Sequence, residues 1–407
     1  MRILIFWESE KWGGVDSHLC ELISNWPNPD DSFYLVTNIG NQGLSRISSD
    51  LSDYGVTVFE ILPFSYTSLL IYLRRFRLGF LFKIPLFILR PLLFFLSRYQ
   101  LSLFFSKLGD FDVFLADNGG YPAAWGTLSS TLAAHDLRIP KIFLLIHHSS
   151  EKLKFPIKLI ESYIDRLIAS RITSYLFVSN ASQASFIKNR QVESFVVDTK
   201  VIHNGIKPTL RPFIVPSELS IFNDLRSSCF FLIGMLGRVE RYKGHEDSLI
   251  AFSQLPLQIK LKTKLVIVGE GRSNEINHLK QLAVGLGILE NVVFTGFLKT
   301  TSVEIIKKLD LLLMLTRDFE GFGLTVLEAM LNEVPVIATD VGAVGEFFDN
   351  STGVLVRPRS PELVSNEIEN LLLSPTNPVW LDRIKNAKLR ALSLSDMSSK
   401  YASIFHE

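Results

Sequence analysis

Short apolar runs alternate with helical patterns along almost the whole chain. The first half holds candidate strands at 2–6, 32–36, 56–60, 113–116, 141–146, 174–178 and 200–202. The second half restarts the pattern, with candidates at 230–236, 264–268, 292–295, 311–315, 335–338 and 353–356. Helices are expected between them, notably at 17–25, 155–170 and 181–188. Buried parallel strands are continuous apolar runs, so the alternation predicts an α/β fold of βαβ units around parallel sheets.

Length and proline placement predict how the chain divides. At 407 residues it exceeds the size at which one hydrophobic core keeps growing, so two domains are expected. Residues 207–224 contain Pro208, Pro212 and Pro216 without clear periodicity, and we place the linker there. The expected domains are 1–206 and 225–377, followed by helices in a tail at 378–407.

Charge and cysteine content exclude several classes of protein. The 42 basic and 41 acidic side chains nearly cancel, which argues against a nucleic-acid partner. The two cysteines, Cys20 and Cys229, lie in different halves and cannot build a disulfide framework, which fits a reducing cytoplasm. The first apolar run is too short for a signal peptide, and no run of about 18 apolar residues predicts a conventional membrane span.

The segment 61–109 has an unusual composition. It contains no acidic residue and is dense in Leu, Ile and Phe, and Pro85 and Pro91 are expected to break it into short helices. Its basic residues are Arg74, Arg75, Arg77, Lys83, Arg90, Arg98 and Lys107. Basic side chains beside apolar clusters are typical of an interfacial membrane helix, so we expect this segment to associate with an anionic membrane. The alternative is a helical excursion that packs on the domain's own sheet.

Two glutamates bracket a glycine-rich turn in the run 317–330. Glu320 precedes Gly321 and Gly323, and Glu328 lies about one turn inside the helix expected at 325–331. The glycines allow close approach of the backbone to a ligand, and the helix start directs free N–H groups at an anion. The run is therefore suited to the hydroxyls and phosphates of a sugar nucleotide. Acidic residues near a helix start can instead serve only the helix dipole.

Two cations follow the apolar run at 230–236. Arg238 and Lys243 precede a helix expected to begin near Gly244, which is the usual place for a ligand in an open α/β sheet. A guanidinium grips phosphate oxygens through parallel N–H bonds, and an ammonium adds a point charge. The alternative for such a pair is a solvated surface.

These stretches together resemble the retaining glycosyltransferases of family four, which carry a group 1 domain and have the GT-B fold. The run 317–346, the turn 237–244, and the strands with their loops at 266–271 and 293–297 follow in the family's order. The first half matches more loosely, through 13–15, the strand that ends in His147, 178–179 and 202–206. The family usually has Gly where this chain has Glu333 and often Asp where it has Lys207; these departures bear on local structure and subfamily, since neither position is needed for phosphate or sugar binding. The resemblance implies two Rossmann-like domains that face a central cleft, with C-terminal helices that cross back to the first domain.

The resemblance also implies roles for individual residues. Catalysis would rest on Glu320, His147, Arg238 and Lys243. Glu320 would hold sugar hydroxyls or support charge near the anomeric centre, and Glu328 would accept from the ribose hydroxyls. The implied donor-binding residues are Gly13, Gly14, Arg238, Lys243, Gly321, Phe322, Gly323, Leu324, Thr325 and Glu328.

Polar residues end two of the expected strands in the first half. His147 and His148 are adjacent, and neighbours in an extended chain point to opposite sides, so we expect no metal site there. No Cys, Asp or Glu spacing completes such a site. Asp117 and Asn118 end the strand at 113–116 and either contact an acceptor or lie in a surface loop.

The function implied is a metal-independent, retaining glycosyltransferase of the hexosyltransferase type. Its donor would be a nucleotide diphosphate sugar, with no further cofactor. Its acceptor would be a glycan, lipid-linked in the biosynthesis of a cell-surface polysaccharide, lipopolysaccharide or glycolipid. The expected location is cytoplasmic and peripheral, at the inner face of the cytoplasmic membrane. The alternatives are a sugar-nucleotide epimerase or soluble glucan synthase of the same fold, or a catalytically silent nucleotide-binding subunit.

Overall fold

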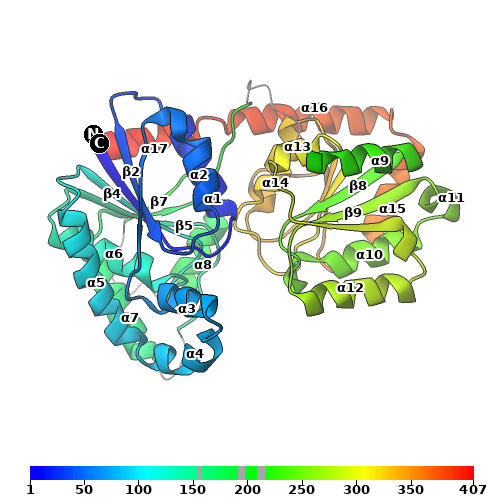
Figure 1. Cartoon of the computed structure of the whole chain (residues 1–407). Helices are drawn as coiled ribbons and strands as arrows, with labels where there is room; N and C mark the ends of the chain where they lie inside the picture. The colour runs from blue at the N-terminus through cyan, green and yellow to red at the C-terminus, as the bar shows by residue number, and fades with distance from the viewer. Residues whose placement is uncertain (154–156, 191–197, 209–216) are drawn as a thin grey trace. The chain divides into compact units, whose positions relative to one another are not determined.

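The computed structural model describes residues 1–153, 157–190, 198–208 and 217–407. These residues form two compact units (Figure 1). The first comprises Met1–Asn204 together with Asp396–Glu407, and the second comprises Gly205–Ser395. Residues 209–216 of the expected linker and the start of the expected helix at 155–170 lie outside the described residues.

A seven-stranded parallel sheet forms the centre of the first unit, in the order β3-β2-β1-β4-β5-β6-β7. Its strands are β1 (Arg2–Trp7), β2 (Ser32–Asn38), β3 (Thr57–Ile61), β4 (Val113–Asn118), β5 (Lys141–Ile146), β6 (Ser174–Phe177) and β7 (Thr199–Val201). The order reverses between β1 and β4. Ligands of open α/β sheets bind at the carboxyl ends of strands beside such a reversal.

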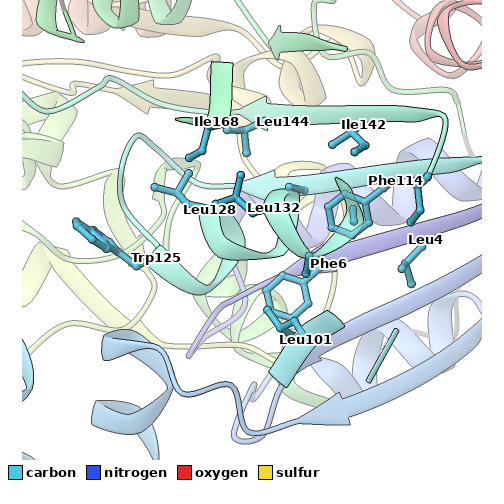
Figure 2. Packing of buried hydrophobic residues seen from close by; sticks show 14 of the residues in the cluster. Leu4, Phe6, Leu101, Phe114, Trp125, Leu128, Leu132, Ile142, Leu144 and Ile168 are labelled. Atoms are coloured by element: carbon cyan, nitrogen blue, oxygen red, sulfur yellow. The ribbon is translucent and has the colours of Figure 1, made fainter. Parts of the chain in front are cut away.

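Helices cover the first sheet and complete its core. They are α1 (Gly14–Ser24), α2 (Leu44–Asp50), η1 (Ser52–Tyr54), α3 (Tyr66–Arg75), α4 (Gly79–Ile88), α5 (Arg90–Ser106), α6 (Trp125–Asp136), α7 (Lys158–Ala169), α8 (Asn180–Arg190) and α17 (Met397–His406). Figure 2 shows the core, in which Phe6 of β1 and Phe114 of β4 pack with Leu101 of α5 and Leu128 of α6. The inner face of α5 is thus part of the core.

The segment 61–109 forms short helices, as expected, but with different breaks. Pro91 lies in the first turn of α5, whereas Pro85 lies inside α4, where its missing N–H removes one intrahelical hydrogen bond without ending the helix. Among the described residues, no single helix is long and apolar enough to cross a membrane. The pair of α4 and α5, bent by 89°, meets that criterion by length and composition.

A six-stranded sheet forms the centre of the second unit, in the order β10-β9-β8-β11-β12-β13, with all its strands parallel. The strands are β8 (Phe231–Leu236), β9 (Thr263–Val268), β10 (Val292–Gly296), β11 (Leu311–Met314), β12 (Val336–Thr339) and β13 (Val354–Val356). This order reverses between β8 and β11. A separate core of buried apolar residues, including Ile233, Leu265 and Leu313, fills the unit.

The helices of the second unit follow its strands. They are η3 (Ser217–Leu219), α9 (Ser220–Ser228), η4 (Arg241–Lys243), α10 (His245–Gln254), α11 (Leu257–Lys260), α12 (Ser273–Gly285), η5 (Leu289–Asn291), α13 (Ser302–Ile306), α14 (Leu324–Leu331), η6 (Val344–Glu346), α15 (Pro361–Leu373) and α16 (Pro378–Ser393). Glu333, at the family's usual glycine position after α14, adopts a φ of +60°, a left-handed conformation that glycine reaches more easily.

The tail divides differently from the expected arrangement. We expected both tail helices to cross back to the first domain, but α16 packs on α14 and belongs to the second unit. Residues from Asp396, including α17, belong to the first unit. The break at Leu394–Asp396 therefore separates two helices whose apolar faces fit different cores. By contrast, every expected strand is present, with its ends within two residues of the predicted ones.

Candidate functional site

An ion pair joins the two loops that leave the carboxyl ends of β8 and β11. Lys243 Nζ lies 2.7 Å from Glu320 Oε2, and Thr316 Oγ1 donates to the same carboxylate oxygen at 2.9 Å. Both members of the pair are half-buried. Burial alone would lower the pKa of Lys243, but the Glu320 carboxylate outweighs it and raises that pKa. The structure thus brings together two predicted catalytic residues at the point where the strand order reverses.

Two glycines, one after β8 and one after β12, allow their loops to pack closely against the loop after β11. Gly244 has a φ of +79°, and a Cβ there would lie 1.9 Å from the carbonyl oxygen of Leu315. Gly342 has a φ of +59°, and its Cβ would lie 2.0 Å from the carbonyl oxygen of Glu320. The amide of Ala343 donates to that same oxygen at 2.9 Å. Since only glycine fits at either position, backbone contacts determine where Lys243 and Glu320 lie.

Arg238 lies beside this pair with its side chain largely in solvent. The side chain is 60% exposed, and its guanidinium donates to Glu240 Oε1 at 3.0 Å. Its positive charge is close enough to act on the pKa of Lys243 as a lesser contribution that lowers it. Arg238 is therefore near Lys243 and exposed, which suits a residue that meets an incoming anion.

The glycine-rich turn leads directly into α14. Gly323 is the N-cap, and Leu324 and Thr325 form the first turn, whose amides have no acceptor within the helix. Phe322 is buried and stacks on Phe347 with ring centroids 4.6 Å apart, while Gly321 is buried beside it. Glu328 lies further along α14 and accepts a hydrogen bond from Ser302 Oγ of α13 at 2.7 Å. Glu320 and Glu328 thus have different neighbours.

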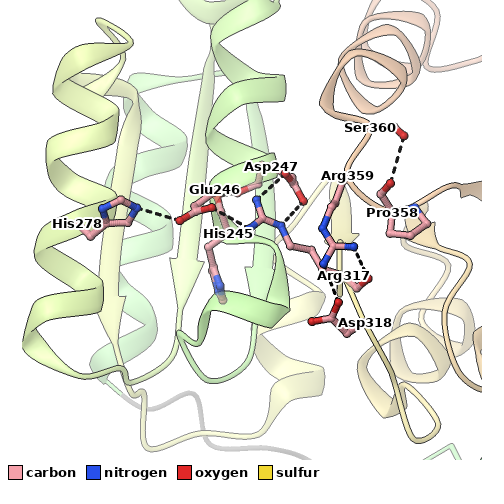
Figure 3. A network of polar contacts seen from close by, with 10 residues as sticks. His245, Glu246, Asp247, His278, Arg317, Asp318, Pro358, Arg359 and Ser360 are labelled. Atoms are coloured by element: carbon pink, nitrogen blue, oxygen red, sulfur yellow. Dashed lines mark hydrogen bonds and ion pairs between the residues drawn. The ribbon is translucent and has the colours of Figure 1, made fainter.

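A charged network not foreseen from the sequence braces the same loop (Figure 3). Arg317 donates to both oxygens of Asp247 at 2.8 and 2.7 Å and to Glu246 at 2.8 Å, and His278 contacts Glu246 at 2.9 Å. The hydrogen bonds to Asp247 and Glu246 raise the pKa of Arg317 despite its burial. On the other side, Arg359 donates to Asp318 at 2.7 Å. No local pattern signals these contacts, because Arg317 lies 70 residues from Asp247 in sequence.

In the first unit, His147 meets an acidic partner at the ends of β4 and β5. His147 Nε2 lies 2.7 Å from Asp117 Oδ1. A carboxylate only accepts, so Nε2 carries the proton and Nδ1 of a neutral ring is left as an acceptor. Asp117 and Asn118 are buried at the end of β4, which excludes the surface-loop alternative. Asp117 thereby orients the predicted catalytic histidine.

His18 completes a buried group that the sequence did not reveal. Its ring lies 4.7 Å from that of His147 in an edge-to-face arrangement, and its Nδ1 lies 4.0 Å from Asp117 Oδ2. Burial, and secondarily His147, hold the pKa of His18 well below its ordinary value. The argument that no Asp or Glu spacing completes a metal site missed Asp117 beside His147, because parallel strands that are distant in sequence end at one edge of the sheet. The ligand atoms of His18, Asp117 and His147 lie within 4.8 Å of one another, close enough to share a metal ion.

His148 lies apart from this group. Its Nδ1 contacts Ser149 Oγ at 3.0 Å.

The turn at Gly13 and Gly14 is held by Asp16. The Gly13 amide donates to Asp16 Oδ2 at 2.8 Å, and Trp7 Nε1 donates to Oδ1 at 3.1 Å. Burial raises the pKa of Asp16 to about 6. A Cβ at Gly13 would meet nothing within 4 Å, so packing inside the unit does not require a glycine there. The small residue leaves open space beside the turn.

Glu8, next to the end of β1, is another carboxylate that the sequence patterns did not single out. It accepts hydrogen bonds from Ser65 and Ser68 of the α3 start and from the Gly126 amide of α6. Burial raises the pKa of Glu8 above its ordinary value in spite of these donors. This carboxylate ties the start of α3 to the edge of the sheet that holds His147 and Asp117.

Parts of the chain are similar to known proteins. Residues 221–390 match the domain family described as glycosyl transferases group 1. The chain is 29% identical over 179 residues to an uncharacterized glycosyltransferase of Methanocaldococcus jannaschii, which covers 42% of this chain and 44% of that protein. It is 33% identical over 133 residues to the lipopolysaccharide core biosynthesis mannosyltransferase LpsB of Rhizobium meliloti, covering 30% of this chain and 36% of that protein. The match thus spans less than half the length of these relatives.

The whole chain also resembles solved structures. The Anabaena Alr3699/HepE structure in complex with UDP has a TM-score of 0.69 and 20% identity, with full coverage of both chains. This likeness confirms the expected fold class of two Rossmann-like domains of the GT-B type.

Proposed function

From the premise that this chain carries a glycosyl transferases group 1 domain within a GT-B fold, we propose that it transfers a sugar from a nucleotide diphosphate sugar to a glycan acceptor. The observation that carries the proposal is the Lys243–Glu320 pair at 2.7 Å, held between the loops after β8 and β11. A fixed cation beside a helix start is suited to a diphosphate leaving group.

The donor site is formed by the second unit. Lys243 and Arg238 bind the diphosphate, and the amides of Gly323, Leu324 and Thr325 at the start of α14 supplement them. Cations placed before the reaction cost no reorganisation when negative charge develops on the leaving group. The UDP bound in the similar Anabaena structure supports a nucleotide donor.

The two glutamates have different tasks in this proposal. Glu320 pairs with Lys243, and it holds sugar hydroxyls or supports positive charge near the anomeric carbon. Glu328, which accepts from Ser302, also accepts from the ribose hydroxyls. Phe322 and Gly321 stay buried and hold the turn in place.

The first unit offers a hydrogen-bond acceptor of its own for a sugar. His147, held by Asp117, presents Nδ1 as an acceptor for a sugar hydroxyl. At the turn of Gly13 and Gly14, the open space beside Gly13 leaves room for a ligand next to α1. We propose that transfer proceeds with retention at the anomeric carbon and needs neither a metal nor a further cofactor.

The acceptor we propose is lipid-linked, and the reaction then belongs to the assembly of a cell-surface polysaccharide or glycolipid. The similarity to a lipopolysaccharide core mannosyltransferase supports a glycolipid acceptor. We further propose that the protein is a peripheral protein of the cytoplasm that acts on this acceptor at the inner face of the cytoplasmic membrane. The exposed apolar helices of the first unit support this location.

The test is release of nucleoside diphosphate from a panel of nucleotide sugars, with and without lipid-linked acceptors. Lys243→Ala or Arg238→Ala should each lower kcat/KM by roughly 10²-fold or more, through loss of a charge partner of the leaving group. Arg241→Ala is the matched control, because it removes an exposed cation from the same turn. Turnover near that of the unchanged protein in both site variants would remove these residues from the mechanism.

Product analysis separates the alternatives. An epimerase alters the donor without any acceptor, a soluble glucan synthase accepts soluble oligosaccharides, and a silent subunit binds nucleotide without turnover. The anomeric configuration of the product, read by NMR, checks retention. Turnover that survives EDTA checks metal independence, and its loss would point to the group of His18, Asp117 and His147.

A further inference from the structure

Helix α4 exposes an unusual amount of apolar surface. All its residues except Gly79 and Leu86 are exposed. Phe80 is 88% exposed, Ile84 71% and Ile88 70%. Isolated apolar residues on a surface are ordinary, but a contiguous apolar helix marks an interaction site. The alternative that this segment packs internally therefore fails for α4.

Two further helices extend the same apolar face. The outer face of α5 exposes Leu92, Leu96 and Tyr99, while its inner face is part of the core. Helix α7, outside the segment singled out by composition, exposes Leu159 and Tyr163. It joins this face through Arg90 of α5, which donates to Glu161 of α7 at 3.2 Å.

The cations of the segment divide into two groups. Three are paired within the unit: Arg74 with Glu10 at 2.6 Å, Arg90 with Glu161 at 3.2 Å, and Arg98 with Asp136 at 2.6 Å. The other four form no ion pair within the described part of the chain: Arg75, Arg77, Lys83 and Lys107. Since 61–109 has no acidic residue, these charges are left for a partner that is anionic and has an apolar interior.

We propose that α4, flanked by the outer faces of α5 and α7, inserts into the interfacial region of an anionic lipid bilayer. The apolar side chains enter the acyl boundary, and Arg75, Arg77 and Lys83 meet the headgroups. The inner face of α5 lies in the core and Arg98 pairs with Asp136, so α5 lies on the membrane and does not span it. This inference rests on the proposed lipid-linked acceptor and names the surface that brings the protein to it.

Co-sedimentation of the full chain with vesicles tests the inference. The vesicles are phosphatidylcholine alone or phosphatidylcholine with a graded share of phosphatidylglycerol. Binding should increase with the anionic share, weaken with added salt, and persist in part at high salt because the apolar contribution is not screened.

Two sets of variants separate the contributions. Phe80→Gln, Ile84→Gln and Ile88→Gln together should abolish the salt-resistant part, whereas Phe230→Gln, Leu257→Gln and Leu261→Gln, equally exposed in the second unit, should not. Arg75→Gln, Arg77→Gln and Lys83→Gln together should weaken low-salt binding at least about tenfold. The matched control removes the exposed Lys262, Lys280 and Lys385 of the second unit.

Several results would overturn the inference. These are no vesicle binding by the unchanged protein, equal binding to neutral and anionic vesicles, or self-association through α4 in place of vesicle binding. An unaltered thermal transition of each variant shows that the first unit remains folded. Vesicle binding can be measured without turnover, so the two proposals fail separately. A protein that is active but does not bind vesicles contradicts the membrane-binding surface alone. A protein that binds vesicles but is inactive contradicts the proposed function alone.

Discussion

At the residue scale, the Lys243–Glu320 pair explains how the half-buried ammonium of Lys243 is stabilised within the protein itself. A half-buried ammonium without a partner would cost free energy, and the carboxylate at 2.7 Å offsets that cost. In the proposed function, a bound diphosphate gives Lys243 a second anion beside Glu320. Replacing Glu320 therefore changes the charge that the ligand meets, whereas Glu328 lies elsewhere on α14 with Ser302 as its neighbour.

This difference predicts that Glu320→Gln and Glu328→Gln affect the affinity for nucleoside diphosphate differently. Glu320→Gln removes a negative charge beside the diphosphate, so affinity for free nucleoside diphosphate should be unchanged or higher while transfer falls roughly 10²-fold. Glu328→Gln should weaken nucleoside diphosphate binding about tenfold, because a charged acceptor for the ribose is lost. Calorimetric titration with the diphosphate product measures both. Equal losses of affinity in the two variants would contradict the assigned roles.

The buried Asp16 predicts a pH dependence of stability in the first unit. Its pKa is raised from 3.8 to about 6 in the folded state, so protonation favours folding. The stabilisation is fully present below pH 3.8 and is lost as the pH rises through about 6. This group should lower the free energy of unfolding by up to about 3 kcal/mol between acidic and neutral pH.

Asp16→Asn should remove that part of the pH dependence. Urea denaturation followed by tryptophan fluorescence measures it, because Trp7 contacts Asp16. Asp110→Asn, an exposed aspartate of the same unit, is the control. A pH dependence identical in Asp16→Asn and the unchanged protein would show that the carboxylate is already ionised in the folded state.

At the scale of elements, the loop from β11 to α14 is held from several sides. Arg317 ties it to α10, Arg359 ties Asp318 to the segment before α15, and the Ala343 amide holds Glu320 from the loop after β12. A functional carboxylate on a loop needs such support, because an error of about 1 Å in position costs roughly 10²-fold in rate.

Gly342→Ala tests this support. Its φ of +59° and the 2.0 Å approach to the Glu320 carbonyl oxygen force the loop to move if a Cβ is added. Transfer should fall at least about tenfold and stability by more than about 1 kcal/mol. Gly285→Ala, at the last residue of α12, meets nothing within 4 Å and is the control, which should leave both transfer and stability nearly unchanged. Full activity of Gly342→Ala would show that this contact does not position Glu320.

At the scale of the whole molecule, the two units have separate cores, and the chain returns to the first unit through α17. Phe405 of α17 is buried, stacked on Phe143 at 5.1 Å and beside Trp26 at 5.6 Å. His406 contacts Asp31 at 2.9 Å, and the Phe405 carbonyl accepts from Lys141 at 2.9 Å. The last helix is therefore part of the first core.

Phe405→Ala should destabilise the first unit by about 3–5 kcal/mol, since it leaves a cavity between two aromatic rings. Four of the five tryptophans lie in the first unit, so their fluorescence reports its unfolding: Trp7, Trp12, Trp26 and Trp125. Phe297→Ala, which is half-exposed in the second unit, is the control. Nucleotide binding by the second unit should survive the change, and its loss together with the first transition would show that the units unfold as one.

Much of the fold and part of the site were determined by the sequence alone. Continuous apolar runs such as 231–236 signal buried parallel strands, and the glycines before α14 signal a turn into a helix. Lys243, Glu320 and the α14 start could be identified because each lies within a run whose chemistry and spacing are local. These signals depend on neighbours a few residues away, and so they survive without knowledge of the tertiary structure.

Only the tertiary structure decided which distant residues meet. The order of strands put Asp117 against His147 and His18 beside both, and it put Arg317 against Asp247; these pairs are separated by 30 and 70 residues in sequence. The tertiary structure also assigned α16 and α17 to different units. It left α4 exposed and buried the inner face of α5. The physical reason is that crossover connections bring strand ends together regardless of their distance in sequence. Apolar periodicity, in turn, predicts which face of a helix is buried but not which element it packs against.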